Sequence, residues 1–233
     1  CIWIGLGVMA IIDLLNRVVK NDKVRTVAAV VTVLVTLLVP AQMASQNWDD
    51  HDRSNRYSAR DFGANYLKSC DKEAIIFCNG DNDTFPLWYN IEVEEERNDV
   101  RACNLSYLQT DWYIDQMKRP YYNSPGLPIS WEYKDYMPGK NEIAWVENRL
   151  HAPLEVSKAF QFLLSDDPRT KRDGEGYIPS DQLYVLSPDS QKIMFKKARR
   201  FTRSEMMVME MLSTNEWKRP MYFAVTIGND YHL

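Results

Sequence analysis

The chain has 233 residues, a formal net charge of −4 and a pI near 5.5. This length is enough for one or two domains with a sizeable core. The negative balance argues against a nucleic-acid scaffold, because such proteins carry a basic face. The cysteines form no CxxC pair, which argues against a zinc site built on such pairs and favours mostly buried thiols. They are Cys1, Cys70, Cys78 and Cys103.

Two apolar stretches open the chain. Residues 26–44 carry no charge over 19 positions, about the length that crosses the hydrocarbon core of a bilayer. Residues 1–12 are also apolar and begin with Cys rather than Met, so we expect them to be the remainder of a truncated membrane helix. The other end stops directly after a strand-like segment, and we expect it to be cut as well.

The connection between the two stretches carries four basic residues and indicates an orientation. The positive-inside rule places this loop in the cytoplasm, and residues after about 45 then lie in the periplasm, with the chain held in the inner (cytoplasmic) membrane. Two alternatives remain, a cleaved signal peptide and a buried hairpin of a soluble protein. The basic residues are Arg17, Lys20, Lys23 and Arg25.

Helix and strand patterns alternate after residue 46. In chain order we predict a helix over 54–69 with Ser54 as its N-cap, a strand over 74–78, a helix over 83–97, a strand over 100–105 and a helix over 110–118. Strand, helix and strand at this spacing indicate a βαβ unit, whose two strands are parallel.

The second half of this region is less regular. Residues 119–150 lack periodicity and predict an ordered, aromatic-rich excursion. We then expect a helix over 153–165, an exposed loop over 166–176, strands over 182–186 and 192–196, a helix over 203–214 and a strand over 221–227. The predicted fold class is therefore α/β, with a two-helix transmembrane hairpin over 1–45 and a periplasmic α/β domain with a mostly parallel sheet over 46–233.

The stretch NGDNDT, residues 79–84, is the most polar turn of the predicted sheet. It follows a buried strand, and ligands of open α/β sheets bind at the carboxyl ends of strands. The favoured interpretation is structural: Asp83 or Thr84 caps the next helix, with Pro86 in its first turn. Two functional alternatives remain, a hard cation held by Asp81 and Asp83, and sugar hydroxyls bound by this turn.

Two further segments carry candidate site residues. Asp111 and Trp112 begin the helix after the second strand, at the same predicted sheet edge, although an acid there is more often a first-turn helix residue. Residues 47–53, NWDDHDR, follow the membrane stretch and could hold a metal or act as acid and base. The favoured interpretation of 47–53 is a solvated turn with Trp48 at the membrane interface.

Four segments together resemble one family of membrane proteins. They are NWDDHDRSNRYSARDFGANYL, NGDNDTFPLWY, DVRACNLSYLQTDWYIDQM and NEWKRPMYFAVT. They are similar to the carboxyl-terminal half of a bacterial family of protein O-mannosyltransferase-like glycosyltransferases, formerly a domain of unknown function. The positions that match the family motif are 79–84, Asp111 and Trp112.

This resemblance implies a polytopic enzyme that transfers a sugar from a lipid-phosphate donor to Ser or Thr of exported proteins. Its catalytic acid would lie in an earlier outer loop, so the catalytic residues of this chain are unknown and its part is expected to be accessory or acceptor-binding. The expected partners are membrane lipid, the lipid-linked sugar and exported acceptor proteins, without nucleic acid, metal or cofactor. The candidate substrate-binding residues are Asn79, Asp81, Asn82, Asp83, Asp111 and Trp112. Two alternatives remain, a membrane-anchored binding or assembly module without transferase activity, and a metal-dependent hydrolase that uses Asp81 and Asp83.

Overall fold

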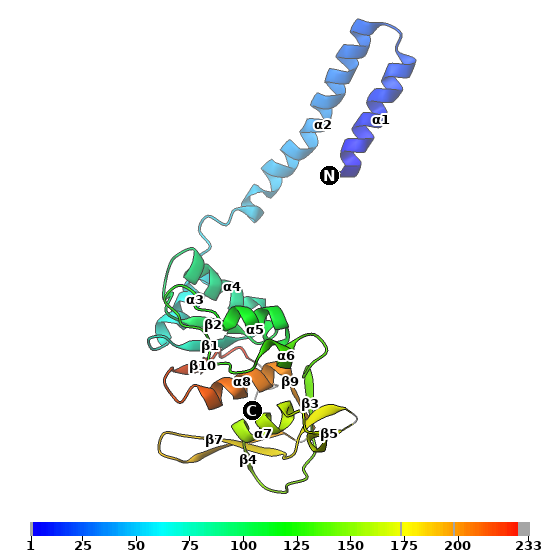
Figure 1. Ribbon diagram of the computed structural model, residues 1–233. Coiled ribbons are helices and arrows are strands. Elements are labelled where there is room, and N and C mark those ends of the chain that lie inside the picture. Colours follow the sequence, from blue (N-terminus) through cyan, green and yellow to red (C-terminus); the bar gives the residue numbers. More distant parts are fainter. Residues whose placement is uncertain (1, 173, 198, 228–233) are drawn as a thin grey trace. The chain divides into compact units, whose positions relative to one another are not determined.

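The computed structural model describes residues 2–172, 174–197 and 199–227. The chain divides into two compact units, Cys1–Arg56 and Tyr57–Leu233, which are described separately below. Their elements are labelled in Figure 1.

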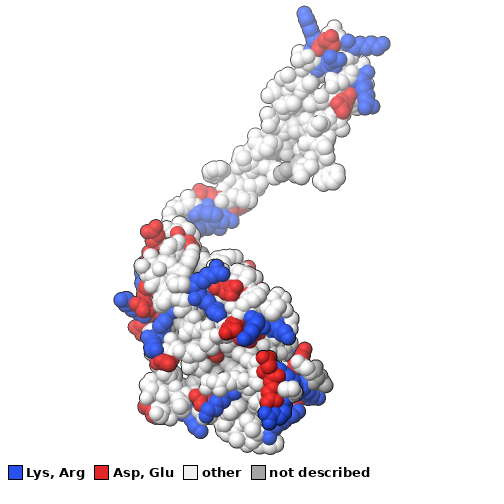
Figure 2. Space-filling view, viewed as in Figure 1, with Lys and Arg blue, Asp and Glu red and all other residues white. Residues whose placement is uncertain are grey.

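The first unit consists of helices α1 (Ile2–Val18) and α2 (Asp22–His51). Asn21 starts α2, because its side-chain oxygen accepts hydrogen bonds from the backbone N–H groups of Lys23 (3.0 Å) and Val24 (3.3 Å). Neither helix buries a residue, so their apolar side chains have no protein core around them. Figure 2 shows Lys, Arg, Asp and Glu gathered where α1 connects to α2, with an uncharged surface along most of both helices.

Within the described residues, α2 is the one helix long and apolar enough to cross a membrane. The predicted span 26–44 lies inside it. The predicted turn over 47–53 is corrected, because α2 continues as helix to His51 and Asp52 then accepts a hydrogen bond from the Ser54 N–H (2.9 Å). The transmembrane hairpin and the domain boundary near residue 45 remain predictions.

The second unit is built around a small parallel sheet. Strands β1 (Ile75–Cys78), β2 (Arg101–Asn104) and β10 (Met221–Phe223) lie in the order β10-β1-β2. Both neighbours of β1 are parallel to it, with Ile75 opposite Arg101 on one side and Met221 on the other. The predicted βαβ unit is confirmed, since helix α4 (Asp81–Glu92) connects β1 to β2.

Helix α3 (Ser58–Ser69) packs against α4, and Gly63 allows the contact. A Cβ atom at Gly63 would lie 2.4 Å from the Pro86 carbonyl oxygen, so any larger residue would push the helices apart. The predicted N-cap Ser54 is corrected, because α3 begins at Ser58 with Tyr57 at the N-cap position.

Two further sheets follow, and they are only partly parallel. In the order β5-β6-β3-β9, the pair β3–β6 is parallel, whereas β3–β9 and β5–β6 are antiparallel. In the order β4-β7-β8, β4–β7 is parallel and β7–β8 antiparallel. The fold class α/β therefore holds, but "mostly parallel" is corrected to partly parallel. The strands are β3 (Ile143–Val146), β4 (Leu154–Glu155), β5 (Lys171–Arg172), β6 (Glu175–Ile178), β7 (Gln182–Leu186), β8 (Lys192–Lys196) and β9 (Arg200–Thr202).

The remaining helices complete the unit. They are η1 (Tyr107–Gln109), α5 (Asp111–Met117), α6 (Tyr133–Tyr136), α7 (Val156–Leu164), η2 (Pro168–Thr170) and α8 (Arg203–Thr214). Helix α8 begins with a capping box, in which the Thr202 hydroxyl accepts from the Glu205 N–H and the Glu205 carboxylate accepts from the Thr202 N–H. Its first nine residues are all buried, so α8 lies inside the domain rather than on its surface.

Several predicted bounds need correction. The helix predicted over 83–97 starts at Asp81 and ends at Glu92; Glu95 and Arg97 have positive φ angles of 54° and 53°, which a helix cannot continue through. The loop predicted over 166–176 contains η2, β5 and the start of β6. The excursion over 119–150 contains α6 and β3, and the strand predicted over 221–227 ends at Phe223.

Candidate functional site

In the turn between β1 and α4, a glycine starts the helix and no side chain caps it. Gly80 is the N-cap residue of α4, with φ 78° and no side-chain capping bond, a conformation that favours glycine. The favoured interpretation of NGDNDT is thus corrected in its detail, because neither Asp83 nor Thr84 caps the helix. Thr84 instead lies within the first turn and donates its hydroxyl to the Gly80 carbonyl (2.7 Å).

A buried hydrogen-bond network joins this turn to the end of β2. Thr84 Oγ1 accepts from Asn104 Nδ2 (2.7 Å), and Asn104 Oδ1 accepts from the Tyr107 N–H (2.9 Å). The Asn104 N–H donates to the hydroxyl of Tyr113 (2.9 Å). This network fixes the carboxyl ends of β1 and β2 against each other, at the sheet edge where ligands of α/β proteins bind.

The candidate residues of NGDNDT occupy different environments. Asn79 accepts a hydrogen bond from Ser106 Oγ (2.6 Å), which ties the two loops together. Asp83 is buried and accepts from the Thr226 hydroxyl, while its other carboxylate oxygen has no partner among the described residues. Asp81 and Asn82 are exposed. Among residues 2–172, 174–197 and 199–227, no three His, Cys, Asp or Glu side chains gather as a metal-binding group.

Asp111 and Trp112 begin α5 as predicted, but the structure uses them differently from each other. Asp111 Oδ2 accepts from the Tyr133 hydroxyl (3.0 Å), so this carboxylate ties α5 to α6. Trp112 is 55% exposed, and its ring lies against Tyr107, with centroids 6.0 Å apart. The carboxylate is therefore occupied within the fold, whereas the indole is available to a ligand.

Four aromatic rings form a continuous row beside this edge, which we call the aromatic strip. Phe85 lies 5.9 Å from Trp88, Trp88 stacks on Tyr107 at 6.1 Å, and Tyr107 reaches Trp112. Phe85 and Trp112 at the two ends are exposed, and the middle two rings are half-buried. Exposed aromatic rows of this kind mark binding surfaces more often than scattered single rings do. Only Trp112 belonged to the predicted site, because the strip joins three separate elements, α4, η1 and α5.

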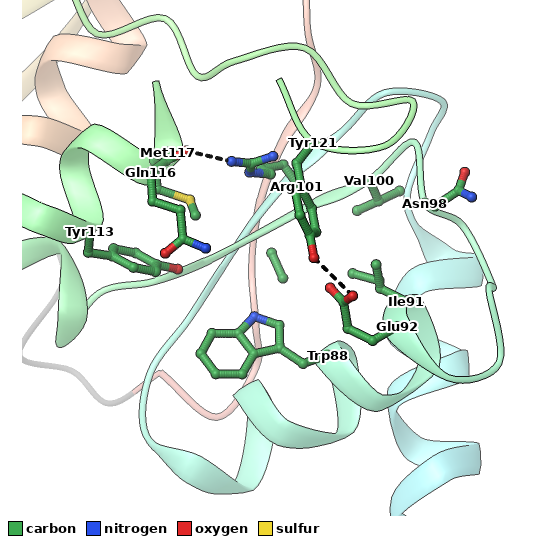
Figure 3. A pocket seen from close by; sticks show the side chains of 11 residues that line it. Trp88, Ile91, Glu92, Asn98, Val100, Arg101, Tyr113, Gln116, Met117 and Tyr121 are labelled. Carbon is green, nitrogen blue, oxygen red and sulfur yellow. Dashed lines mark hydrogen bonds between the residues drawn. The ribbon is translucent and has the colours of Figure 1, made fainter. Parts of the chain in front are cut away.

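A cavity of about 220 Å³ lies along the edge strand β2, next to the strip, and it was not predicted (Figure 3). Its walls combine aromatic rings, aliphatic groups and polar groups. The rings come from Trp88, Tyr113 and Tyr121, the aliphatic groups from Ile91, Val100, Ala102 and Met117, and the polar groups from Glu92, Asn98, Arg101 and Gln116. Figure 3 shows Tyr121 beside Arg101, with the Tyr121 hydroxyl reaching Glu92.

The cysteines of the described chain are buried free thiols, as predicted. They are Cys70, Cys78 and Cys103. Burial raises the pKa of Cys78 to about 11 and that of Cys103 well above its usual range. Because the thiolate is the reactive form, these side chains are poor nucleophiles. Cys1 lies outside the described residues.

Comparisons with known proteins agree on one family. The family model described as TMEM260-associated domain 2 matches residues 59–196 and 187–233. A protein O-mannosyl-transferase tmem260 from Dictyostelium discoideum is 22% identical over 153 residues, which cover 58% of this chain and 19% of the relative. The chain thus spans about a fifth of the length of this curated relative. No solved structure matches the chain.

Proposed function

The chain belongs to the family of the TMEM260-associated domain 2, and on that premise we propose that it is the membrane-anchored, ligand-binding part of a protein O-mannosyltransferase-like enzyme. The resemblance stated from sequence is supported at the level of an O-mannosyltransferase-like family. Its restriction to bacteria is corrected, because the curated relative comes from Dictyostelium discoideum. In this proposal α2, with α1 beside it, anchors the chain, and the α/β domain lies outside the cytoplasm.

One observation carries the binding role, the aromatic strip. The C–H faces of a sugar ring are apolar and pack on aromatic rings, and the exposed rings Phe85 and Trp112 offer such faces. Asp81 and Asn82 are exposed at the adjacent turn. The Asp81 carboxylate can accept hydrogen bonds from hydroxyl groups, and the Asn82 amide can both donate to them and accept from them. We assign the strip and this turn to the mannosylated product or the Ser/Thr-rich acceptor segment of an exported protein.

The hydrogen bonds of the buried Asp83 and of the half-buried Asn79 and Asp111 support an accessory rather than catalytic part. Asp83 accepts from Thr226, Asp111 from Tyr133 and Asn79 from Ser106. Side chains committed to internal hydrogen bonds hold loops in place, and using them as acid or base would break those bonds. In the proposal these residues position the exposed ones, and the lipid-phosphate-linked donor acts elsewhere in the enzyme.

The test compares binding by matched tryptophan variants of the full chain in lipid nanodiscs. A Ser/Thr-rich peptide and the same peptide carrying O-linked mannose serve as labelled probes in fluorescence anisotropy. Trp112→Ala should weaken binding of at least one probe by about tenfold, since stacked aromatic groups at binding sites often contribute more than 1 kcal/mol. Trp145→Ala is the control, because Trp145 is 51% exposed but lies on β3.

The proposal is contradicted if neither peptide binds, or if both variants bind like the unaltered chain. In that case the alternative is a membrane-anchored assembly module that recognises no sugar or acceptor. Loss of binding in both variants would show that exposed tryptophans act nonspecifically and would also count against the strip.

A further inference from the structure

The cavity beside β2 contains a buried positive charge whose hydrogen-bonding capacity is only partly used. Arg101 is 4% exposed. Its Nη2 donates to the carbonyls of Gln116 (2.9 Å) and Arg119 (3.1 Å), at the carboxyl end of α5. Its Nε and Nη1 have no hydrogen-bond partner among the described residues. A buried N–H group without an acceptor costs stability, and more so on a charged group.

The surroundings supply no carboxylate to balance this charge. No salt bridge of the described chain includes Arg101, and burial lowers the pKa of its guanidinium. The ring of Tyr121 lies over it, with the ring centroid 5.3 Å from Arg101 Cζ. Glu92 lines the same cavity, but its carboxylate accepts the hydroxyls of Tyr121 and Tyr122 (both 2.9 Å). Arg101 therefore lacks an anionic partner within the described protein.

We propose that this cavity binds a small hydroxylated carboxylate, such as a sugar acid, with its carboxylate paired to Arg101. The volume of about 220 Å³ is below that of pockets for drug-sized ligands and suits one small molecule. A carboxylate oxygen accepts from Nη1 and a hydroxyl oxygen of the ligand accepts from Nε, which supplies the missing acceptors on both sides of the guanidinium. The ring of the ligand packs on Trp88 and Tyr113, and its hydroxyls bond to Glu92, Asn98 and Gln116 at the wall.

A monoanion fits this wall better than a phosphate dianion. Glu92 is a second carboxylate at the cavity, and its repulsion grows with the charge of the ligand. The Glu92 carboxylate can accept further hydrogen bonds, which the several hydroxyl groups of a sugar acid donate. The positive charge deep in the wall and the acid near it thus select a ligand with one carboxylate and several hydroxyls.

The ligand reaches the guanidinium when the Tyr121 ring turns aside. Nε and Nη1 are shielded from solvent, and Tyr121 lies over the guanidinium with 41% of its surface exposed. Its backbone is fixed by a pair of hydrogen bonds with Ser124 (2.9 and 3.0 Å). The side chain is held by the hydrogen bond from its hydroxyl to Glu92 and by its contacts with the Tyr122 ring and the guanidinium, and the ion pair with a bound anion compensates for their loss.

Calorimetric titration of the full chain in detergent micelles tests the proposal with three probes. Glucuronate should bind, whereas glucose, which lacks the charge, and inorganic phosphate, which lacks the ring, should bind more weakly by about tenfold or more, the worth of one charge-assisted hydrogen bond. Equal binding of glucose or of phosphate would overturn the proposal, and so would the absence of heat with glucuronate.

Matched variants test whether the ligand binds at Arg101. Arg101→Met should weaken glucuronate binding by about tenfold or more, whereas Arg119→Met, at an exposed arginine of the same segment, should leave it unchanged. If Arg101→Met does not fold, Glu92→Gln serves instead and should strengthen binding by a few fold, because it removes the repelling charge. Glu95→Gln is its control, at an exposed acid three residues further. Unchanged affinity in Arg101→Met, or in Glu92→Gln where that variant replaces it, would overturn the proposal. The experiment does not involve the aromatic strip or the peptides, so its failure is distinct from failure of the proposed function.

Discussion

Arg97 precedes strand β2 and Arg101 is its first residue, and only the first of these two arginines is paired with an acid. Arg97 forms a forked pair with Asp99, from Nε to Oδ1 (2.9 Å) and from Nη2 to Oδ2 (3.0 Å). It also donates to the carbonyls of Leu67, Cys70 and Asp71. Arg101 has two carbonyl partners and no acid.

The pKa shifts of the two guanidinium groups follow from this difference. The hydrogen bonds that Arg97 donates to Asp99 raise the pKa of Arg97, whereas burial lowers that of Arg101. A charge that is paired and bonded on both sides holds structure together, because removing it leaves its partners unsatisfied. A buried charge without an acid is instead a candidate for binding an external anion.

Replacing Arg97 should have the largest effect on stability. Arg97→Met removes the forked pair and the hydrogen bonds to the carbonyls at the end of α3, and it leaves Asp99 with the Glu73 N–H as its remaining donor from another residue. We expect a loss of about 3 kcal/mol, near the lower bound for breaking one side of a buried ion pair, because this pair is partly exposed. Urea unfolding of the full chain in detergent measures it, with Arg119→Met as the control. A loss below about 1 kcal/mol would remove the distinction between the two arginines.

The network at the sheet edge should respond next. Thr84→Val keeps the shape of the side chain but removes the oxygen that accepts from Asn104 and donates to Gly80. The buried Asn104 amide is then unsatisfied, and we expect a loss of about 2 kcal/mol in the same unfolding assay. Thr110→Val, at a half-buried threonine whose hydroxyl donates only to the Tyr107 carbonyl, should cost less. If the order of the two were reversed, the Asn104 network would not be what fixes the two strands.

The sequence predicted those parts of the fold that depend on local patterns. The buried runs at β1 and β2 and the periodic helix α8 were located to within about one residue, because strong burial patterns dominate there. The five short strands β3, β4, β5, β6 and β9 were missed. Each has at most four residues, too few to show an alternating pattern, and β3, β4 and β9 find their partners far away in the sequence.

The candidate site was predicted by its position rather than by its contacts. The sheet edge holds Asn79 and Thr84 together with Asn104, as the parallel topology required. The sequence could not reveal that Asp111 is bonded to Tyr133, 22 residues away, or that Arg101 lacks an acid. A nearby acid in sequence, Asp99, suggests a partner for either arginine, and only the fold assigns it to Arg97.

Acid should weaken the Arg97 pair in a defined range. The hydrogen bond from Arg97, with the Glu73 N–H, lowers the pKa of Asp99 to about 2, against about 3.9 in an unfolded chain. A depressed carboxylate contributes stability that is fully present above the unfolded pKa and is lost as the pH falls through the folded pKa. We therefore expect about 1–2 kcal/mol to disappear between about pH 5 and pH 2.

Asp99→Asn separates this contribution from that of other acids. The variant should be less stable at pH 7 by a similar amount and should lose less stability than the unaltered chain between about pH 5 and pH 2, measured by urea unfolding across the range. Parallel pH curves for the two proteins would mean that Asp99 is not the group that titrates.

Arg101→Met should have the smallest effect on the stability of the unliganded protein, in contrast to Arg97→Met. The substitution gives up two hydrogen bonds to carbonyls, but it also removes a buried charge without an acid and fills its place with an apolar chain. These effects oppose each other, so we expect a change within about 1 kcal/mol. A loss as large as that of Arg97→Met would make Arg101 a second structural clamp at the end of α5. A small change combined with lost glucuronate binding would assign its charge to the ligand, since a residue that the fold does not need for stability is then needed for recognition.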